Sequence, residues 1–535
     1  MTEDESIDVL GAYLTSERVA REATAAREIA RACGGLPLAL RIATARLLSQ
    51  PDMWIADAAR ILRDSRRRLR ELHAGRLTVR ASFESSYRAL SLPARRAFRR
   101  LASLPTPSFP QWAVAVAAGV DSSSQLIGEL AESQLVTPVR RPAPGQARYA
   151  FHDLVRLFAV EPSADDPGAP VDALVDAWCA LASDASRRLG TRTLDITRLH
   201  AAMPCPVEGV VDDPPVWFDE EQANLIEVLR YACASGWPRR AAALLTALNS
   251  YFVIRHAVDE WRDCAEAVER VASAAGDRLA LAYVAESRVL LHIALDQLDE
   301  VARQAEAATA LFTELNDEPG ATQMRYHLAF AYRRLGDIDS ALRLTTELTE
   351  AYLRLGDPFG QAAAHNALGV LYHDHLTDLD RSQDHFERAY ALLEGVEGRP
   401  RRQVGFSLGS LHLDRGRPAQ AEVLLVDALA RARDDNDLVG IAYILHRLGA
   451  AWIELDRTAE ARSALEESYG LCRRIGKREG EAMALEALAT LDERVGVPDG
   501  GAGRLRTAAD IYAALNLPSD LRRVRARLDL LHQGP

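Results

Sequence analysis

Histidine and aspartate side chains crowd one stretch of the sequence, where they suggest a metal site. The residues concerned are His365, His373, His375, His385, Asp374, Asp378 and Asp384. A zinc site needs ligands that converge on one point, and two residues two positions apart on a helix point to different sides. We therefore expect no metal there. No Ser/His/Asp or Cys/His pattern stands out locally, so no catalytic residue is predicted, although residues distant in sequence could still meet in space.

The chain contains a single lysine, Lys477, and a phosphate-binding P-loop requires one. In a P-loop, a Gly-rich turn after a strand ends in Lys-Ser/Thr, so that backbone amides and an ammonium group hold the phosphates. Here Gly476-Lys477 is followed by Arg478 and lies inside a helical repeat. The segment is therefore interpreted as a chance match and not as a nucleotide site.

A third set of side chains could bind a partner without catalysing a reaction. They recur at fixed offsets in the last three hundred residues: Tyr283, Glu286, Gln323, Tyr326, Phe330, Arg333, Asn366, Val370, His373, Phe406, Tyr443 and His446. Aromatic and arginine side chains on a concave surface are typical of a peptide-binding groove. They predict a groove for a protein, a peptide or a small ligand. The alternative is that they cover the surface and bind nothing specific.

The segments that must position this set repeat every forty residues. One column holds Leu328, Leu368, Leu408, Leu448 and Leu488. The next column is small throughout: Ala329, Gly369, Gly409, Gly449 and Ala489. A further small column holds Ala341, Ser382, Ala421, Ala461 and Gly501. A fixed period of this length indicates a solenoid.

Each repeat reads as a helix, a tight turn and a second helix. Gly336, Gly416 and Asp456 fall at the turn, where residues that tolerate a left-handed backbone are needed. The small columns let the two helices cross closely. These columns match the tetratricopeptide repeat, with about six residues more than the usual 34. Residues 237–535 are therefore predicted to form about seven such repeats in a right-handed α-solenoid, with the first helix of each on the concave wall.

The N-terminal residues 1–76 read as a small helical bundle. Thr2 with Glu5 forms a capping box at the first helix. A second helix is expected from Ser16 to Cys33, a third begins at Pro37, and a fourth covers Met53 to His73.

Residues 77–160 change pattern and predict a winged helix. Short helices precede two apolar runs, Leu135–Val139 and Tyr149–Phe151, which flank the turn-rich segment Arg140–Gly145. Residues 161–236 are expected to form a linker, Glu161–Pro170, and an irregular helical segment broken by the turn cluster Met203–Pro215.

Two motifs in this N-terminal third resemble those of NB-ARC signalling ATPases of the STAND type. Cys33–Leu40 (CGGLPLAL) is similar to the GLPL motif of the helical subdomain, and Phe151–Arg156 (FHDLVR) to the MHD motif that ends the winged helix. Leu77–Leu90 resembles the start of the winged helix in bacterial regulators of the AfsR type. Together with the repeats, the motifs resemble the C-terminal part of an AfsR-like regulator.

The resemblance implies a role in nucleotide binding for Pro37, near the adenine, and for His152, at the ADP β-phosphate. No parallel-sheet pattern or Walker-B run precedes the GLPL motif, however, so the chain is expected to lack the P-loop ATPase core and the DNA-binding region. We therefore expect no cofactor. ADP or ATP would bind only together with a P-loop region on a separate chain.

Composition and charge exclude several other classes. The net charge of −12 is spread along 535 residues, and the six cysteines form no CxxC pair, which disfavours a disulfide framework. No apolar run reaches membrane-spanning length, so we expect a cytoplasmic protein without a membrane partner. The helix expected at Ser122–Ser133 carries Glu129 and Glu132 and no cation, which argues against direct DNA contact.

The sequence thus predicts a mainly all-α chain: a helical bundle, a winged helix and a tetratricopeptide-type solenoid. The favoured function is a non-enzymatic sensor and protein-interaction module of an AfsR-like regulator. Its expected partner is a protein or peptide, and a separate ATPase or DNA-binding chain is a further candidate. Nucleotide binding with a separate P-loop chain, and DNA binding through the winged helix, are the alternatives.

Overall fold

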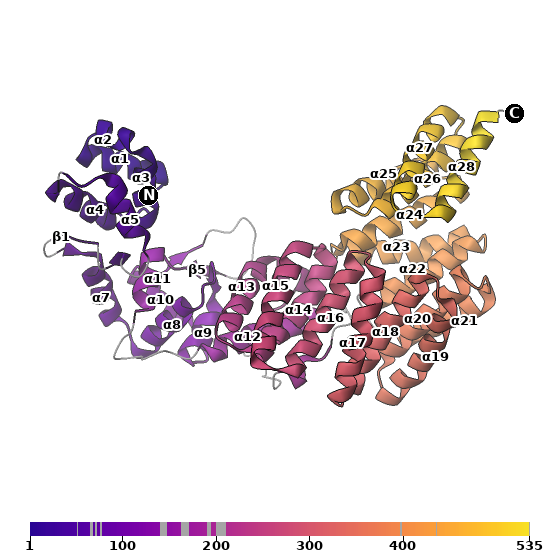
Figure 1. The fold of residues 1–535 in the computed structure, drawn as a ribbon, viewed down its shortest axis with the longest axis horizontal. Coiled ribbons are helices and arrows are strands. Elements are labelled where there is room, and N and C mark those ends of the chain that lie inside the picture. The colour runs from indigo at the N-terminus through magenta and orange to yellow at the C-terminus, as the bar shows by residue number, and fades with distance from the viewer. Residues whose placement is uncertain are drawn as a thin grey trace. The chain divides into compact units, whose positions relative to one another are not determined.

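The fold is mainly α-helical in a computed structural model of the chain (Figure 1). The structure describes residues 1–50, 52–64, 68–69, 72–74, 77–139, 147–161, 171–189, 194–199, 210–395, 399–434 and 436–533. They divide into two compact units. The first takes the described residues within Met1–Ala180 and Glu221–Tyr231, and the second those within Leu181–Ala202, Val210–Glu220 and Ala232–Pro535.

The first unit begins with five helices: α1 (Glu3–Leu14), α2 (Ser16–Arg21), α3 (Ala23–Cys33), α4 (Pro37–Ser49) and α5 (Ile55–Arg63). The capping box is confirmed, because Glu5 N–H donates to Thr2 Oγ1 at 3.2 Å and Thr2 N–H donates to Glu5 Oε2 at 2.8 Å. The prediction of a single helix from Ser16 to Cys33 is wrong. The helix breaks at Glu22, whose carboxylate accepts from Ala56 N–H at 2.9 Å.

The helix expected over Met53–His73 is also shorter. It ends at Arg63, because Asp64 has an extended backbone, and residues 65–67 and 70–71 lie outside the described part. A short antiparallel pair follows, β1 (His73–Ala74) and β2 (Leu77–Thr78).

The winged helix follows in the same unit. Its helices are α7 (Val79–Ala89), α8 (Leu92–Ser103), α9 (Gln111–Ala118), α10 (Ser124–Glu132) and α11 (Asp153–Ala159). Its strands are β3 (Phe109–Pro110), β4 (Thr137–Pro138) and β5 (Arg148–Ala150). They form an antiparallel sheet in the order β3-β5-β4, so the expected two-stranded wing gains a third short strand. The turn-rich residues 140–145 lie outside the described part.

Buried aromatic rings form the core of the winged helix. Phe98 lies 5.6 Å from Phe151 and 6.3 Å from Phe158, between ring centroids, and all three are nearly inaccessible to solvent. A buried ion pair joins Arg148 of β5 to Glu221 of α13 (Pro214–Ala234), and Asn224 Nδ2 donates to the same carboxylate at 2.7 Å. The expected linker residues 162–170 and residues 203–209 of the expected turn cluster lie outside the described residues.

The second unit consists of helical pairs whose first helices begin 39 to 41 residues apart (Figure 1). These first helices are α14 (Pro238–Arg255), α16 (Arg278–Ala294), α18 (Glu318–Leu335), α20 (Pro358–Asp374), α22 (Arg399–Asp414), α24 (Leu438–Glu454) and α26 (Arg478–Arg494). The second helices are α15 (Val258–Ala275), α17 (Leu298–Glu314), α19 (Ile338–Leu355), α21 (Leu379–Leu392), α23 (Pro418–Asp434), α25 (Thr458–Ile475) and α27 (Pro498–Ala514). α28 (Pro518–Gln533) ends the array, and α12 (Asp172–Arg188) and the short helix η1 (Ile196–Arg198) precede it.

Close packing within each pair depends on the small columns. A Cβ atom added at Gly449 would lie 2.5 Å from Leu465 Cγ, and one added at Gly369 would lie 2.5 Å from the Phe386 ring. Ser382 Oγ, in the second small column, donates to the Gly369 carbonyl at 2.9 Å. The turns need a left-handed backbone, as expected: φ is +57° at Asp456. The predicted fold class is thus confirmed, whereas the boundaries of the four predicted domains stay predictions.

Candidate functional site

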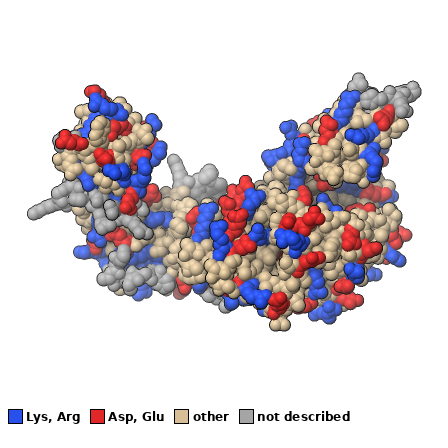
Figure 2. All heavy atoms as spheres, viewed as in Figure 1, with Lys and Arg blue, Asp and Glu red and all other residues tan. Residues whose placement is uncertain are grey.

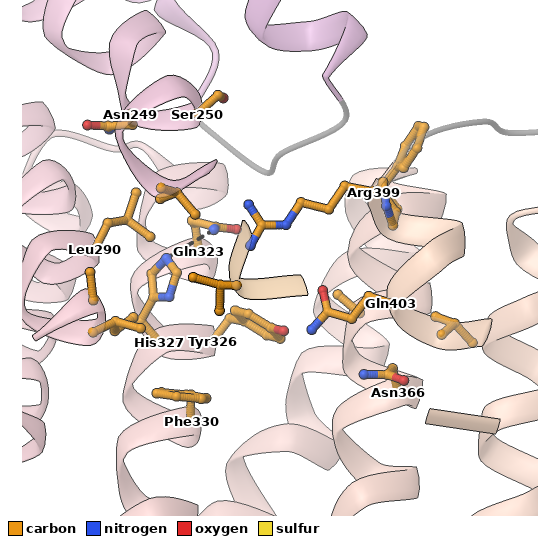
Figure 3. A pocket seen from close by; sticks show the side chains of 18 of the residues that line it. Asn249, Ser250, Leu290, Gln323, Tyr326, His327, Phe330, Asn366, Arg399 and Gln403 are labelled. Carbon is orange, nitrogen blue, oxygen red and sulfur yellow. Dashed lines mark hydrogen bonds between the residues drawn. The ribbon is translucent and has the colours of Figure 1, made fainter. Parts of the chain in front are cut away.

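A cavity of about 340 Å³ lies on the inner side of the repeats, within the second unit (Figure 3). First helices of consecutive pairs contribute most of its wall, and the polar and aromatic side chains among them are Asn249, Ser250, His256, Gln323, Tyr326, His327, Phe330, Phe359, Asn366, Arg399, Gln403 and Lys477. Apolar side chains fill the space between, including Leu290, Ile293, Leu393 and Val404. An apolar wall with a few polar groups is typical of a small-molecule site.

The level at which each first helix meets the cavity shifts steadily along the array. Leu290 and Ile293 lie in the second half of α16, and Gln323 and Phe330 in the middle of α18. Arg399 is the first residue of α22. Because the helices wind as a superhelix, a cavity on its inner side meets successive helices at different heights.

Contacts between early and late repeats close the superhelix beside the cavity. Lys477 Nζ donates to the Ala294 carbonyl at 3.1 Å and to Asp296 Oδ2 at 3.0 Å. Arg255 Nη1 donates to the Asn436 carbonyl at 2.8 Å. The only lysine of the sequence therefore has a structural role, as a bond between the second and the seventh pair.

Four of the predicted groove residues line the cavity: Gln323, Tyr326, Phe330 and Asn366. Gln323 Nε2 donates to His327 Nε2 at 3.1 Å. Arg333 lies just outside, with its guanidinium 5.5 Å from the centroid of the Phe330 ring, and burial lowers its pKa. The sequence reasoning missed Arg399 and Gln403. The second could have been found, because it lies five residues before Leu408, as Gln323 lies five before Leu328.

Tyr283 and Glu286 are covered by another part of the same unit. Tyr283 Oη donates to the Asp195 carbonyl at 2.6 Å, and Leu194 N–H donates to Glu286 Oε1 at 3.2 Å. Both side chains are buried, and burial raises the pKa of Tyr283. Residues 194–199 thus occupy this part of the inner face.

The other predicted groove residues lie outside the cavity lining. Phe406 packs against the core formed by the fifth and sixth pairs, and burial raises the pKa of Tyr443. Burial lowers the pKa of His446 to about 4, so this imidazole is neutral near pH 7. Val370 packs beside Phe386 and Leu408.

His373 belongs to a polar ladder that crosses three first helices. Its Nε2 lies 2.9 Å from Asp414 Oδ2, and its Nδ1 contacts Asp374. Arg447 Nη2 donates to Asp414 at 2.8 Å. The hydrogen bonds to Asp374 and Asp414 raise the pKa of His373 to about 9. This arrangement is a structural cross-link between helices.

In the first unit, the two motifs that resemble those of NB-ARC proteins touch each other. His152 Nε2 donates to the carbonyl of Gly34 in the GLPL segment at 2.6 Å, and its Nδ1 accepts from Leu154 N–H at 3.3 Å. Pro37 is the first residue of α4. Both ring nitrogens of His152 are therefore engaged within the protein, where they hold the end of the winged helix against the bundle.

The structure gives little support to the other sites considered from the sequence, which are a metal site and a DNA-contacting helix. Within the described residues, no group of three or more His, Cys, Asp or Glu side chains is placed to hold a metal ion. On α10, Glu129 Oε2 accepts from Ser91 N–H at 3.1 Å. Figure 2 shows acidic and basic side chains interspersed over the face of the repeats that it displays. Of the helices that the structure describes, none combines the length and the apolar composition needed to cross a bilayer.

Comparison with known proteins identifies two regulatory proteins that are similar to this chain. No family model matches the sequence. The regulatory protein AfsR of Streptomyces griseus is 30% identical over 543 residues, which cover 99% of this chain and 54% of that protein. AfsR of Streptomyces coelicolor is 28% identical over 425 residues, which cover 69% of this chain and 42% of that protein. The chain thus spans about half the length of the curated relatives it matches.

A solved structure supports the same assignment of the fold. It is a signal transduction ATPase with numerous domains (STAND) protein with a tetratricopeptide repeat sensor, from Pyrococcus horikoshii. The TM-score is 0.52 at 12% identity, over 92% of this chain and 72% of that one. The resemblance inferred from the GLPL and FHD motifs is confirmed, because the chain is similar along almost its whole length to part of the regulatory protein AfsR.

Proposed function

We propose that the chain is a non-enzymatic regulatory module that senses a ligand through the inner face of its repeats. The observation that carries this proposal is the cavity within the second unit, whose wall comes from the first helices of consecutive repeats. Ligand occupancy would favour one arrangement of the repeats over others and so alter what the module binds, because a ligand shifts a conformational equilibrium by its differential affinity for the states.

The size of the cavity favours a small ligand, or the end of a peptide, over a folded protein. About 340 Å³ lies at the lower end of the range of small-molecule sites. The contacts of Lys477 and Arg255 close the superhelix beside it, which restricts access for a bulky partner. A protein partner, such as a separate ATPase or DNA-binding chain, would then bind elsewhere on the module.

The two alternatives stay predictions. Nucleotide binding through Pro37 and His152 would require His152 to give up its bonds to Gly34 and Leu154. DNA binding through α10 would require an acidic helix to approach phosphates.

A double substitution of two cavity residues tests the proposal. The tagged full chain is incubated with a cell extract, washed and denatured, and the small molecules and peptides released are compared by mass spectrometry. We expect a compound that is retained by the wild type and reduced at least about tenfold by Tyr326→Ala combined with Phe330→Ala, since both rings line the cavity.

Val423→Ala is the matched control, because this side chain on the outer helix α23 is 71% exposed. The control should retain the compound as the wild type does. If the wild type, the double variant and the control release the same material in the same amounts, the cavity is not the sensing site.

A further inference from the structure

The cavity carries positive charge and no described acidic side chain. Its lining includes Arg399 and Lys477, but no Asp or Glu among the described lining residues. The chain as a whole has 76 acidic residues against 64 basic ones. A lining of this sign in an acidic protein indicates an anionic ligand, because clefts lined by one sign of charge concentrate the opposite ion.

The charge of Lys477 is already compensated. Its ammonium group lies 3.0 Å from Asp296 Oδ2, and it also donates to the Ala294 carbonyl. The neighbouring His256 is held neutral, since burial and the charge of Lys477 lower its pKa. These two residues therefore add little uncompensated charge to the cavity.

Arg399 differs, because its guanidinium meets no described acceptor. Its Nη1 is buried without a hydrogen-bond partner among the described residues. Figure 3 shows the side chain reaching from the start of α22 towards Gln323 on α18. A buried donor without a partner is costly, and the first turn of a helix also favours a negative charge. A bound anion would accept a hydrogen bond from Arg399 and would lie at the first turn of α22.

The surroundings of Arg399 define the rest of the ligand. Asn366 is 8% exposed, and its Oδ1 has no donor among the described residues, so the ligand should offer an N–H or O–H group. Leu290, Phe330 and Val404 supply apolar wall for a hydrocarbon body. A single guanidinium fork matches one carboxylate in bidentate fashion.

We propose that the cavity binds a small organic carboxylate with an apolar body, and that Arg399 is the residue that recognises its carboxylate. This inference rests on the proposed function, which it narrows to one class of ligand. It also gives Asn366 and Gln403 a role, as the polar groups beside Arg399 that orient the ligand.

Two probes with the same hydrocarbon body, one a carboxylate and the other its neutral amide, test the inference by calorimetric titration of the full chain. They are 4-phenylbutyrate and its neutral amide, 4-phenylbutyramide. We expect the carboxylate to bind the wild type at least about tenfold more tightly than the amide, as the loss of a charge-assisted hydrogen bond implies. Arg399→Gln should remove this preference, and Arg399→Lys should restore part of it, because lysine keeps the charge but not the fork.

Arg433→Gln is the control, because Arg433 lies on the outer helix α23 and pairs with Glu467. It should leave both affinities within about twofold of the wild type. Equal binding of the two probes by the wild type, no binding of either, or a carboxylate affinity unchanged by Arg399→Gln would each overturn the inference.

The failures of the inference and of the proposed function are distinguishable. If both probes bind equally and Phe330→Ala weakens both, the cavity is a binding site but does not recognise charge. If neither probe binds while the extract experiment still yields a compound that depends on Tyr326 and Phe330, the ligand belongs to another class.

Discussion

At the scale of single residues, the polar ladder of His373, Asp414 and Arg447 shows how a predicted ligand residue can be structural. The sequence predicted His373 as a groove residue, but its two nitrogens contact Asp374 and Asp414. The side chain is 19% exposed. Sequence reasoning could not separate a histidine that binds a ligand from one that pairs with a carboxylate forty-one residues away.

The ladder predicts a pH dependence of stability. The folded-state pKa of His373, about 9, lies above its ordinary value of 6.5. Its contribution to the free energy of unfolding is therefore fully present below about pH 6.5 and is lost as the pH rises through about 9.

Replacement of His373 should reveal this dependence of stability on pH. We expect His373→Gln to lower the free energy of unfolding by about 1–2 kcal/mol near neutral and lower pH, since partial exposure weakens a charged hydrogen bond. Denaturant unfolding at about pH 6 and pH 9.5 measures the difference, which should shrink at the higher pH. A difference that grows with pH would contradict the role given to the protonated imidazole.

At the scale of the helical elements, the repeats were predictable because their packing imposes local rules. A glycine or alanine must follow the leading leucine wherever a large side chain of the second helix presses against the first, as Leu465 does at Gly449. Those rules recur at a fixed spacing, so one sequence was enough to find the helical pairs. The break at Glu22 was not predictable, because it depends on a bond to Ala56 across the bundle.

Two glycines in neighbouring helices test the packing rule. Gly449→Ala would place a methyl group 2.5 Å from Leu465 Cγ and should destabilise the chain by about 1–3 kcal/mol. Gly470→Ala, on the exposed side of α25, meets nothing within 4 Å and should stabilise it by about 0.5–1 kcal/mol. Thermal unfolding of both variants provides the comparison, and equal effects of the same sign would refute the rule.

The candidate site was only partly predictable from the elements. Fixed offsets from the leading leucine selected the right level on α18 and α20, where Gln323, Tyr326, Phe330 and Asn366 line the cavity. On α22 the residue selected was Phe406, which lies outside the lining, whereas the cavity meets this helix at Gln403 and at Arg399 in its first turn. A fixed offset carries no information on the pitch of the superhelix, which arises from small rotations accumulated over several repeats.

At the scale of the whole molecule, contacts between distant repeats shape the cavity. Lys477 and Asp296 lie 181 residues apart in the sequence and form an ion pair at 3.0 Å within the second unit. No local sequence pattern predicts such a contact. From the sequence alone, Lys477 was interpreted only as part of a chance match to a P-loop. The contact matters because it holds the second pair against the seventh beside the cavity.

Loss of this contact should loosen the closure without unfolding the repeats. Lys477→Met leaves the Ala294 carbonyl and the Asp296 carboxylate without their ammonium partner. We expect faster amide hydrogen exchange in the turn around residues 294–298, because local opening becomes less costly. Lys477→Arg, which keeps the charge, should exchange close to the wild-type rate. Unchanged exchange in Lys477→Met would show that other contacts hold the closure.

Hydrogen–deuterium exchange with and without saturating 4-phenylbutyrate locates the binding site in the intact chain. Binding of the carboxylate in the cavity should slow exchange in α18, α20 and the first turn of α22, and should change it little in the outer helices α19 and α23. The Arg399→Gln variant should lose this protection. Protection confined to other helices, or none at any concentration of the probe, would contradict a carboxylate-binding cavity on the inner face of the repeats.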